Sequence, residues 1–419
     1  MDNRINVDVR SEIGKLEGVI LHTPGNEIEN MTPENAERAL YSDILNLSVA
    51  SKEYAQLSGV LNKICKTYQV NDLLTAILSN EKVKDSLVKK ICKNENCFEI
   101  EDYLMAQSEQ ELARSFIEGV IMKKDSLTNF MSKERYVLRP LHNFFYMRDA
   151  AISCIDQVLI GRMASRVRER ESIIMEAIFD YHTKFNTKTV IPDGREKSDS
   201  NITIEGGDVL IVRDDIMLIG IGARTTTQGV DFVLDKLKER GEKKHIIVQE
   251  LPLAPESFIH LDMVFTLLDK DMCMVYEPVI LRPNRFQTVH IKVDNGKVCI
   301  KNVDNILVAL KSLGIDLKPI YCGGDNDAWI QEREQWHSGA NFFGLAPGKI
   351  IGYGRNVYTI DALNKNGFEV VKASEIISGK VDFNTLGKSV VTIEGSELAR
   401  GGGGARCMTM PICRSKVDW

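Results

Sequence analysis

The sequence has no run of apolar residues long enough to span a membrane, and its first residues, MDNRINVDVRSEIGK, lack the apolar core of a signal peptide. It also has no dense block of Lys and Arg, and its formal net charge is −6. Nucleic-acid-binding proteins usually show a basic face. These absences predict a cytoplasmic protein that binds neither membranes nor nucleic acids.

A disulfide framework and a cysteine-based metal site are missing as well. The nine cysteines are odd in number and are scattered along 419 residues, which favours reduced thiols. Cys92 and Cys97 flank the stretch KNEN, but no second Cys or His pair lies near them in the sequence. Ordinary structural cysteines are therefore the favoured interpretation of this pair. We expect no metal and no cofactor.

Glycine and proline are scarce in one long part of the chain. Between residues 51 and 133 there is no proline, and the only glycines are Gly59 and Gly119. Apolar residues recur there with the spacing of a buried helix face, as at Leu57, Val60, Leu61, Ile64 and Cys65. We expect an inserted α-helical bundle at residues 51–133 and a single α/β body made of residues 1–50 and 134–419.

In the α/β body, short apolar runs alternate with helical segments. Three segments share a spacing in which a polar residue precedes a glycine by eleven or twelve positions: Asp149 and Gly161, Asp208 and Gly220, and Asn341 and Gly352. Residues 260–280 and 389–412 fit the same template more loosely. Five such units predict a cyclic α/β array, in which each unit packs on its neighbours and polar loops gather at the central mouth. The rival interpretation is an open doubly wound sheet, but its GxGxxG fingerprint is absent.

Polar residues capable of chemistry stand beside the expected strand starts, namely Asp149, Glu205, His260, Asp262 and Cys407. Taken singly, each has an ordinary explanation, such as a turn residue, a buried histidine or a structural cysteine. Taken together, a thiol and an imidazole favour nucleophilic catalysis, and two aspartates in one pocket favour a planar guanidinium cation. The set predicts attack of a thiol on a guanidinium carbon.

Six motifs, in order along nearly the whole chain, resemble one known family: LHTPGNEIENMTPEN, HNFFYMRD, IEGGDVL, IGIGARTT, HLDMVFT and ARCMTMP. On these motifs the sequence resembles the arginine deiminases of the guanidine-modifying superfamily. The resemblance implies the pentein fold, which is a five-bladed α/β propeller, with an inserted helical bundle. It also implies that residues 1–50 and 134–419 form the catalytic part.

The resemblance assigns catalytic roles motif by motif: Cys407 as nucleophile, His260 as general acid and base, Asp149 and Asp262 as ligands of the guanidinium nitrogens, and Glu205 as a helper in proton transfer. It implies that the substrate is also bound by Asn143, Arg168, Arg224, Leu40 and Gly401. The glycine run 401–404 allows the loop before the nucleophile to move. Some family members carry an arginine in that loop where this chain has Gly402.

The activity implied is hydrolysis of free L-arginine to L-citrulline and ammonia through a covalent thiouronium on the cysteine, without a cofactor or metal. Two related activities stay open, because they use the same or a similar site: an amidinotransferase and an arginine dihydrolase, which continues past citrulline. A different class also stays open, a non-catalytic pentein that only binds. The expected partner is the small-molecule substrate, and a homo-oligomer is left open.

Overall fold

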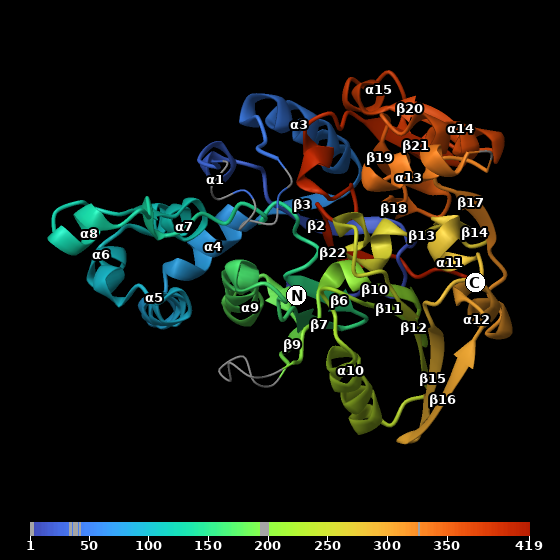
Figure 1. The fold of residues 1–419 in the computed structure, drawn as a ribbon, viewed down its shortest axis with the longest axis horizontal. Helices are drawn as coiled ribbons and strands as arrows, with labels where there is room; N and C mark the ends of the chain where they lie inside the picture. The colour runs from blue at the N-terminus through green and yellow to red at the C-terminus, as the bar shows by residue number, and fades with distance from the viewer. Residues whose placement is uncertain (1–3, 33–35, 37–40, 42, 193–200, 326) are drawn as a thin grey trace.

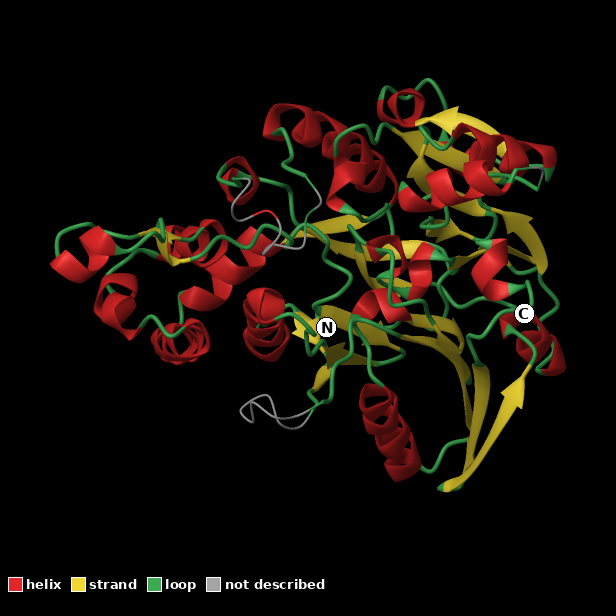
Figure 2. Ribbon diagram, in the orientation of Figure 1, coloured by secondary structure: helices red, strands yellow, loops and turns green. Residues whose placement is uncertain are grey.

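The computed structural model describes residues 4–32, 36, 41, 43–192, 201–325 and 327–419. The structure is mixed α/β, with small separate sheets toward the middle of the molecule and most helices toward its outside (Figures 1 and 2). Within the described residues no sheet closes on itself. Leu40, predicted to close over the substrate, lies outside the described residues.

Five sheets share one pattern, in which two antiparallel strands are followed by a strand that pairs parallel with the second. The five sets are β6 (Ala151–Cys154), β7 (Gln157–Ile160) and β9 (Lys188–Val190); β10 (Val209–Arg213), β11 (Ile216–Ile221) and β12 (Lys244–Glu250); β13 (Phe265–Asp269), β14 (Met272–Val275) and β17 (Lys318–Tyr321); β18 (Phe343–Ala346), β19 (Lys349–Tyr353) and β21 (Ser389–Ile393); and β22 (Met410–Arg414), β2 (Leu16–Leu21) and β3 (Lys66–Gln69). The last set joins the two ends of the chain.

Three further strands extend two of these sheets, and two small strand pairs lie apart from them. The extensions are β15 (Thr288–Asp294) and β16 (Lys297–Val303) beside β12, and β20 (Glu369–Lys372) beside β21. The separate pairs are β1 (Ile5–Asn6) with β8 (Phe185–Asn186), and β4 (Val120–Ile121) with β5 (Tyr136–Leu138).

Helices connect the parallel strands, because a parallel pair needs a long crossover. They are α9 (Glu169–Tyr181), α10 (Thr227–Arg240), α11 (Glu277–Ile280), α12 (Ile306–Ser312), α14 (Val357–Lys365), α15 (Ala373–Ile377) and α3 (Leu47–Ile64), while α13 (Ala328–Trp336) links two sheets. Local signals set their ends: the Thr226 side chain accepts from Gly229 N–H at the start of α10, and Gly241 ends that helix at φ 66°.

The spacing between polar residue and glycine seen in the sequence has a structural cause. Each polar residue lies before the first strand of an antiparallel pair, and its glycine lies at the end of the second. A Cβ added to Gly161 would lie 2.5 Å from Asp149 O, and one added to Gly220 would lie 2.4 Å from Asp208 Oδ1. The glycine therefore lets the second strand pack directly against the residue that starts the first.

Five short helices project to the left of the sheets in Figure 1: α4 (Val70–Leu78), α5 (Glu81–Glu95), α6 (Glu101–Met105), α7 (Glu109–Glu118) and α8 (Leu127–Met131). They lie within the range predicted as a helical bundle. The first part of that range instead joins the sheets, since α3 packs on α15 and β3 pairs parallel with β2, with Gly18 opposite Lys66. The short strand pair β4–β5 also falls partly inside the range.

Apolar side chains from the sheets and the projecting helices form continuous cores. One cluster joins Leu74 of α4, Leu87 of α5 and Phe116 of α7 to Ile178 of α9, so the projection packs against α9. A second cluster surrounds Cys407 with side chains from β2, α3 and β21. None of the described helices is long and apolar enough to cross a membrane.

Candidate active site

Five buried polar residues precede the first strands of the five sheets: Asp149, Asp208, Asp262, Asn341 and Cys407. None of them is more than 4% exposed. Three of these are predicted site residues, and the other two are the repeat positions to which the sequence assigned no chemistry. Equivalent strand starts thus bring residues from distant parts of the chain to one place.

Hydrogen bonds between neighbouring units connect these five positions. They run from Gly207 N to Asp149 Oδ1 (3.1 Å), from Leu261 N to Asp208 Oδ1 (2.9 Å), from Asn341 Nδ2 to Asp262 O (3.2 Å), from Cys407 N to Asn341 Oδ1 (3.3 Å) and from Arg148 N to Cys407 O (3.0 Å). The bonds pass from each sheet to the next and return to the first. Each candidate residue is therefore fixed by the backbone or side chain of a neighbouring unit.

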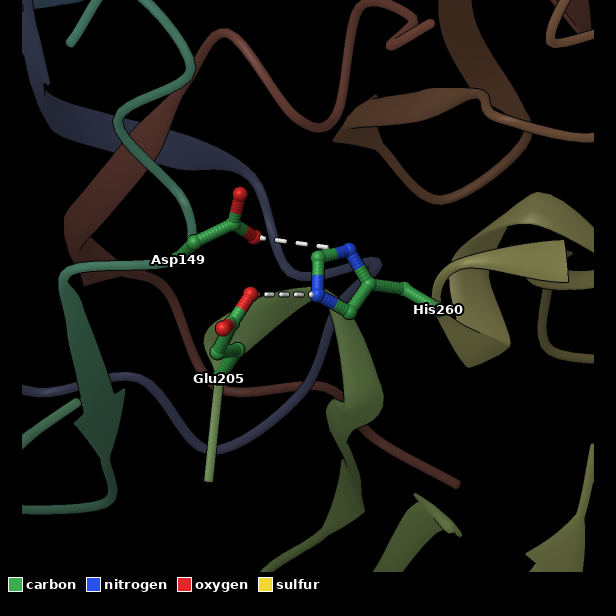
Figure 3. A group of neighbouring side chains, drawn as sticks. All are labelled: Asp149, Glu205 and His260. Carbon is green, nitrogen blue, oxygen red and sulfur yellow. Dashed lines mark hydrogen bonds and ion pairs between the residues drawn. The ribbon is translucent and has the colours of Figure 1, made fainter. Parts of the chain in front are cut away.

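His260 lies between two carboxylates (Figure 3). Its Nε2 is 2.9 Å from Glu205 Oε2, and its Nδ1 is 3.7 Å from Asp149 Oδ1. Burial lowers the pKa of His260, but the charge of Asp149 and the hydrogen bond to Glu205 outweigh it and raise the pKa to about 9. His260 is therefore protonated at neutral pH.

Glu205 is the counter-ion of that imidazolium. Burial raises its pKa, whereas the hydrogen bond with His260 and the charge of Arg224 lower the pKa to about 2. The glycines that follow Glu205 make room for this pair. A Cβ on Gly207 would lie 2.4 Å from His260 Nδ1, so the Glu-Gly-Gly sequence is needed for the imidazole to pack over the backbone.

Cys407 Sγ faces an acceptor and a donor. It lies 3.7 Å from Asp262 Oδ2 and 3.2 Å from Asn341 Nδ2. Burial and the charges of Asp262 and Asp149 raise the pKa of the thiol well above its usual value. Even with Arg168 and Arg406 paired to these carboxylates, Cys407 is a protonated thiol, and a further cation bound in the cavity would favour the thiolate.

Both predicted guanidinium ligands already pair with an arginine of the chain. Arg168 Nη1 donates to Asp149 Oδ2 at 2.7 Å, and Arg406 Nη1 donates to Asp262 Oδ2 at 2.8 Å. Glu171 holds Arg168 in place. In each aspartate the arginine binds Oδ2 and leaves Oδ1 free of that arginine. The two ion pairs therefore orient the carboxylates.

Seven predicted residues line one small cavity: Asn143, Asp149, Arg168, Arg224, His260, Gly401 and Cys407. Glu205 and Asp262 do not line it; they lie behind His260 and Cys407, which they contact. Arg224 Nη1 is 3.9 Å from Glu205 Oε1. An outer hollow adjoins the cavity and shares Arg224, Gly401 and Gly402 with it. The structure therefore places every described candidate at or directly behind one hollow.

The glycine run before Cys407 packs against an aromatic ring. A Cβ on Gly401 would lie 2.3 Å from Tyr146 Oη, and one on Gly403 would lie 2.5 Å from the same ring. Gly402 has φ 85° and has open space where a side chain would begin. Close packing on Tyr146 and one left-handed residue thus require glycine here.

The imidazole and the two carboxylates also meet a simple geometric test for a metal site. One ligand atom each from Asp149, Glu205 and His260 lies within 4.8 Å of the others. However, the carboxylates face opposite nitrogens of the ring (Figure 3). A single ion can bind only one of these nitrogens, so the arrangement suits proton transfer better than metal binding.

Four buried residues beside the site were not predicted as functional: Glu12, Glu171, Asn341 and Arg406. Arg406 precedes Cys407 directly and Glu171 follows Arg168 by three positions, so their places in the sequence offered a signal. Asn341 was found by the repeat spacing. Glu12 had no signal, because its partner Arg406 is 394 positions away.

Comparison with known sequences identifies the relatives of this site. The family model described as arginine deiminase matches residues 37–414. An arginine deiminase of Listeria innocua serovar 6a is 33% identical over 435 residues, with 100% of both chains covered. One of Bacillus cereus (strain B4264) is 32% identical, with 98% of this chain and 99% of that protein covered.

The chain belongs to the arginine deiminase family. The predicted family and enzyme class, a hydrolase acting on amidine C–N bonds, are thereby confirmed. Solved structures with low sequence identity show a similarity of fold alone. An amidinotransferase from Microseira wollei in the saxitoxin biosynthetic pathway aligns at TM-score 0.54 and 14% identity, over 98% of both chains. A dimethylarginine dimethylaminohydrolase aligns at TM-score 0.50 and 13% identity, over 94% of this chain and 99% of that one. These neighbours have the pentein fold.

Proposed function

We propose that this arginine deiminase family member hydrolyses free L-arginine to L-citrulline and ammonia through a covalent intermediate on Cys407. The observation that carries the proposal is that the buried side chains of Cys407, His260 and Asp149 line the same cavity. Asp262 contacts the thiol from behind, and Glu205 holds the imidazole. A nucleophile, a proton donor and one carboxylate therefore line one cavity, and a second carboxylate lies directly behind the nucleophile.

The guanidinium is bound by Asp149 and Asp262 in this mechanism. Its positive charge offsets the two carboxylates that disfavour ionisation of Cys407, so the thiol loses its proton to solvent as the substrate enters. Asn143, Arg168 and Arg224 take the α-amino acid end, because they line the same cavity. Their positions support a clamp on the α-carboxylate.

The chemical steps then follow the two protonation states of His260. The Cys407 thiolate forms a bond to the guanidinium carbon, and protonated His260 donates its proton to the leaving nitrogen, which departs as ammonia. The C–N bond is thereby exchanged for a C–S bond in a thiouronium. Neutral His260 takes a proton from water, the hydroxide adds to the same carbon, and the C–S bond breaks. The hydroxyl group of the adduct releases its proton to solvent as the carbonyl of citrulline forms. Since the ammonia released earlier takes up one proton in solution, the net products are citrulline and ammonium.

We also propose that the five sheets form a five-bladed pseudo-symmetric propeller. The closed series of hydrogen bonds through Asp149, Asp208, Asp262, Asn341 and Cys407 supports this arrangement. For the division of the chain, we propose an insert that begins at Val70, after β3, in place of the predicted start at residue 51. The parallel pairing of β3 with β2 supports the later start.

Product analysis with arginine as the only substrate tests the function. Equal amounts of citrulline and ammonia are expected. Ornithine with two equivalents of ammonia would instead indicate a dihydrolase. Turnover that needs an added amine would indicate an amidinotransferase. Binding of arginine without any product would indicate a non-catalytic pentein.

A further inference from the structure

We infer that Asn341 is a further catalytic group, which donates a hydrogen bond from its side-chain amide to the sulfur of Cys407 and stabilises it as a thiolate. Neither the motifs nor the family likeness assigned it this role. The inference rests on the proposed function, in which that sulfur is the nucleophile. Asn341 itself is 1% exposed and lies directly before β18.

The hydrogen-bond network fixes which end of the amide faces the sulfur. Oδ1 accepts from the backbone N–H groups of Arg406 (2.9 Å) and Cys407 (3.3 Å). Nδ2 donates to Asp262 O at 3.2 Å and reaches Cys407 Sγ at 3.2 Å. If the amide were turned over, its NH₂ group would face the two backbone N–H donors, and its oxygen would face the carbonyl oxygen of Asp262. The NH₂ group therefore points at the thiol.

The charges around the sulfur show why such a donor matters. Asp262 and Asp149 disfavour a thiolate, and Arg406 is a cation nearby, but its guanidinium is taken up by Glu12 and Asp262. His260 lines the same cavity and is itself paired with Glu205. A donor that carries no net charge stabilises the thiolate without repelling the cationic substrate.

The same bond acts twice in the proposed reaction. It stabilises the thiolate before attack, and it stabilises the thiolate again as the leaving group when water releases citrulline. In the covalent intermediate the sulfur carries no full negative charge, so the bond is weaker there. An interaction that strengthens only as charge develops raises kcat more than it lowers KM.

The test is Asn341→Asp, which separates the two halves of the amide. A carboxylate still accepts from the N–H groups of Arg406 and Cys407, but it loses the donors to Sγ and to Asp262 O and adds a negative charge beside the sulfur. We expect kcat at pH 7 to fall by about ten- to a hundredfold, as for loss of a hydrogen bond to a charged group, with KM changed less. The alkylation of Cys407 by iodoacetamide, followed on its own peptide by mass spectrometry, should require a higher pH.

The matched control is Asn305→Asp. Asn305 Oδ1 accepts from Val308 N–H at 3.0 Å at the start of α12, so this variant makes the same chemical change at another asparagine whose oxygen accepts from the backbone. Asn305 does not line the cavity that holds Cys407. Its kcat, its thermal unfolding temperature and its Cys407 alkylation profile should match those of the unaltered protein.

The possible outcomes are separable. An unaltered kcat and alkylation profile in Asn341→Asp would overturn the inference and leave Asn341 a purely structural residue. Because Asn341→Asp also adds a negative charge, the alkylation profile of Asn341→Ala, which removes the donor without adding a charge, decides whether or not Asn341→Asp folds, and an unshifted profile overturns the inference. If the unaltered protein releases no citrulline, the proposed function fails, yet the alkylation profiles still test the amide–thiol contact.

Discussion

Arg406, the residue next to the candidate nucleophile, donates from Nη1 to Oδ2 of Asp262 at 2.8 Å. The same guanidinium makes two 3.0 Å bonds to Glu12, and its side chain is 1% exposed. An internal arginine therefore fixes one of the two carboxylates proposed to bind the guanidinium of the substrate. The N-terminal segment takes part in the site through Glu12, although it lies far from Cys407 in sequence.

Arg406→Met should destabilise the protein strongly, because it leaves Glu12 and Asp262 buried without their cation. Removal of one partner from a buried ion pair typically costs about 3–5 kcal/mol. Urea unfolding should show a decrease of this size in the free energy of unfolding.

The control for Arg406 is Arg10→Met. Arg10 pairs with Asp8 and Asp214 at the surface, where its side chain is 28% exposed. Exposed ion pairs contribute about 0–1 kcal/mol, so this variant should unfold close to the unaltered protein. Equal losses for the two arginines would contradict the importance of burial at Arg406.

Cys407→Ser should abolish citrulline formation and leave the fold intact. A serine hydroxyl ionises far less readily than a thiol near neutral pH, and the surrounding packing barely changes. Citrulline release and far-UV circular dichroism together check the prediction. Cys299→Ser is the control, because Cys299 is exposed and remote from the cavity lining. Turnover near the unaltered level in Cys407→Ser would remove this thiol from the mechanism.

Much of this site could be predicted because the fold repeats. Residues that start equivalent strands converge, so the shared spacing of Asp149, Asp208 and Asn341 is enough to locate three of the five central positions in the sequence. The partners of those residues could not be found in the same way. The side chains of Glu12 and Arg406 come into contact only in the folded chain, since they are 394 positions apart in the sequence.

The start of the helical range predicted from residue 51 shows a second limit of sequence patterns. Leu57, Val60, Leu61 and Ile64 correctly predicted a helix, which the structure has as α3. The periodicity cannot tell which surface a helix packs against. The strand β3, which contains Tyr68, begins just after this helix. It was missed because a strand of four residues is too short to show an alternating pattern.

Glu205→Gln should change the pH dependence of catalysis. Asp149 and Glu205 together hold the pKa of His260 near 9, so loss of the Glu205 carboxylate lowers that pKa and reduces the protonated fraction of the general acid as pH rises. The ratio of kcat/KM for the variant to that of the unaltered protein should fall as pH rises from about 6 to 9. Above the new pKa of His260, the ratio should fall about tenfold per pH unit.

The pH slope separates this effect from a general loss of structure, which would lower the ratio equally at every pH. Glu239→Gln, which removes an exposed partner of Lys236, is the control and should give a flat ratio. The same linkage affects stability. Because the pKa of His260 is raised from 6.5 to about 9, its stabilising contribution is full below pH 6.5 and is lost as pH rises through about 9.

Agmatine should be a very poor substrate compared with arginine. It keeps the guanidinium but lacks the α-carboxylate, so Arg224 and Arg168 would stay in the cavity without the anion that we propose they bind. Sites built around such a group can reject analogues that lack it by about four to five decades in kcat/KM. Arg224→Ala should reduce the preference for arginine over agmatine, mainly by slowing arginine turnover.

Arg168→Ala is a poorer test of the clamp, because Arg168 also orients Asp149. Arg240→Ala is the control, since Arg240 pairs with Asp156 and Glu242 outside the cavity lining. Similar kcat/KM values for agmatine and arginine in the unaltered protein would contradict the carboxylate clamp and would favour a substrate without an α-carboxylate.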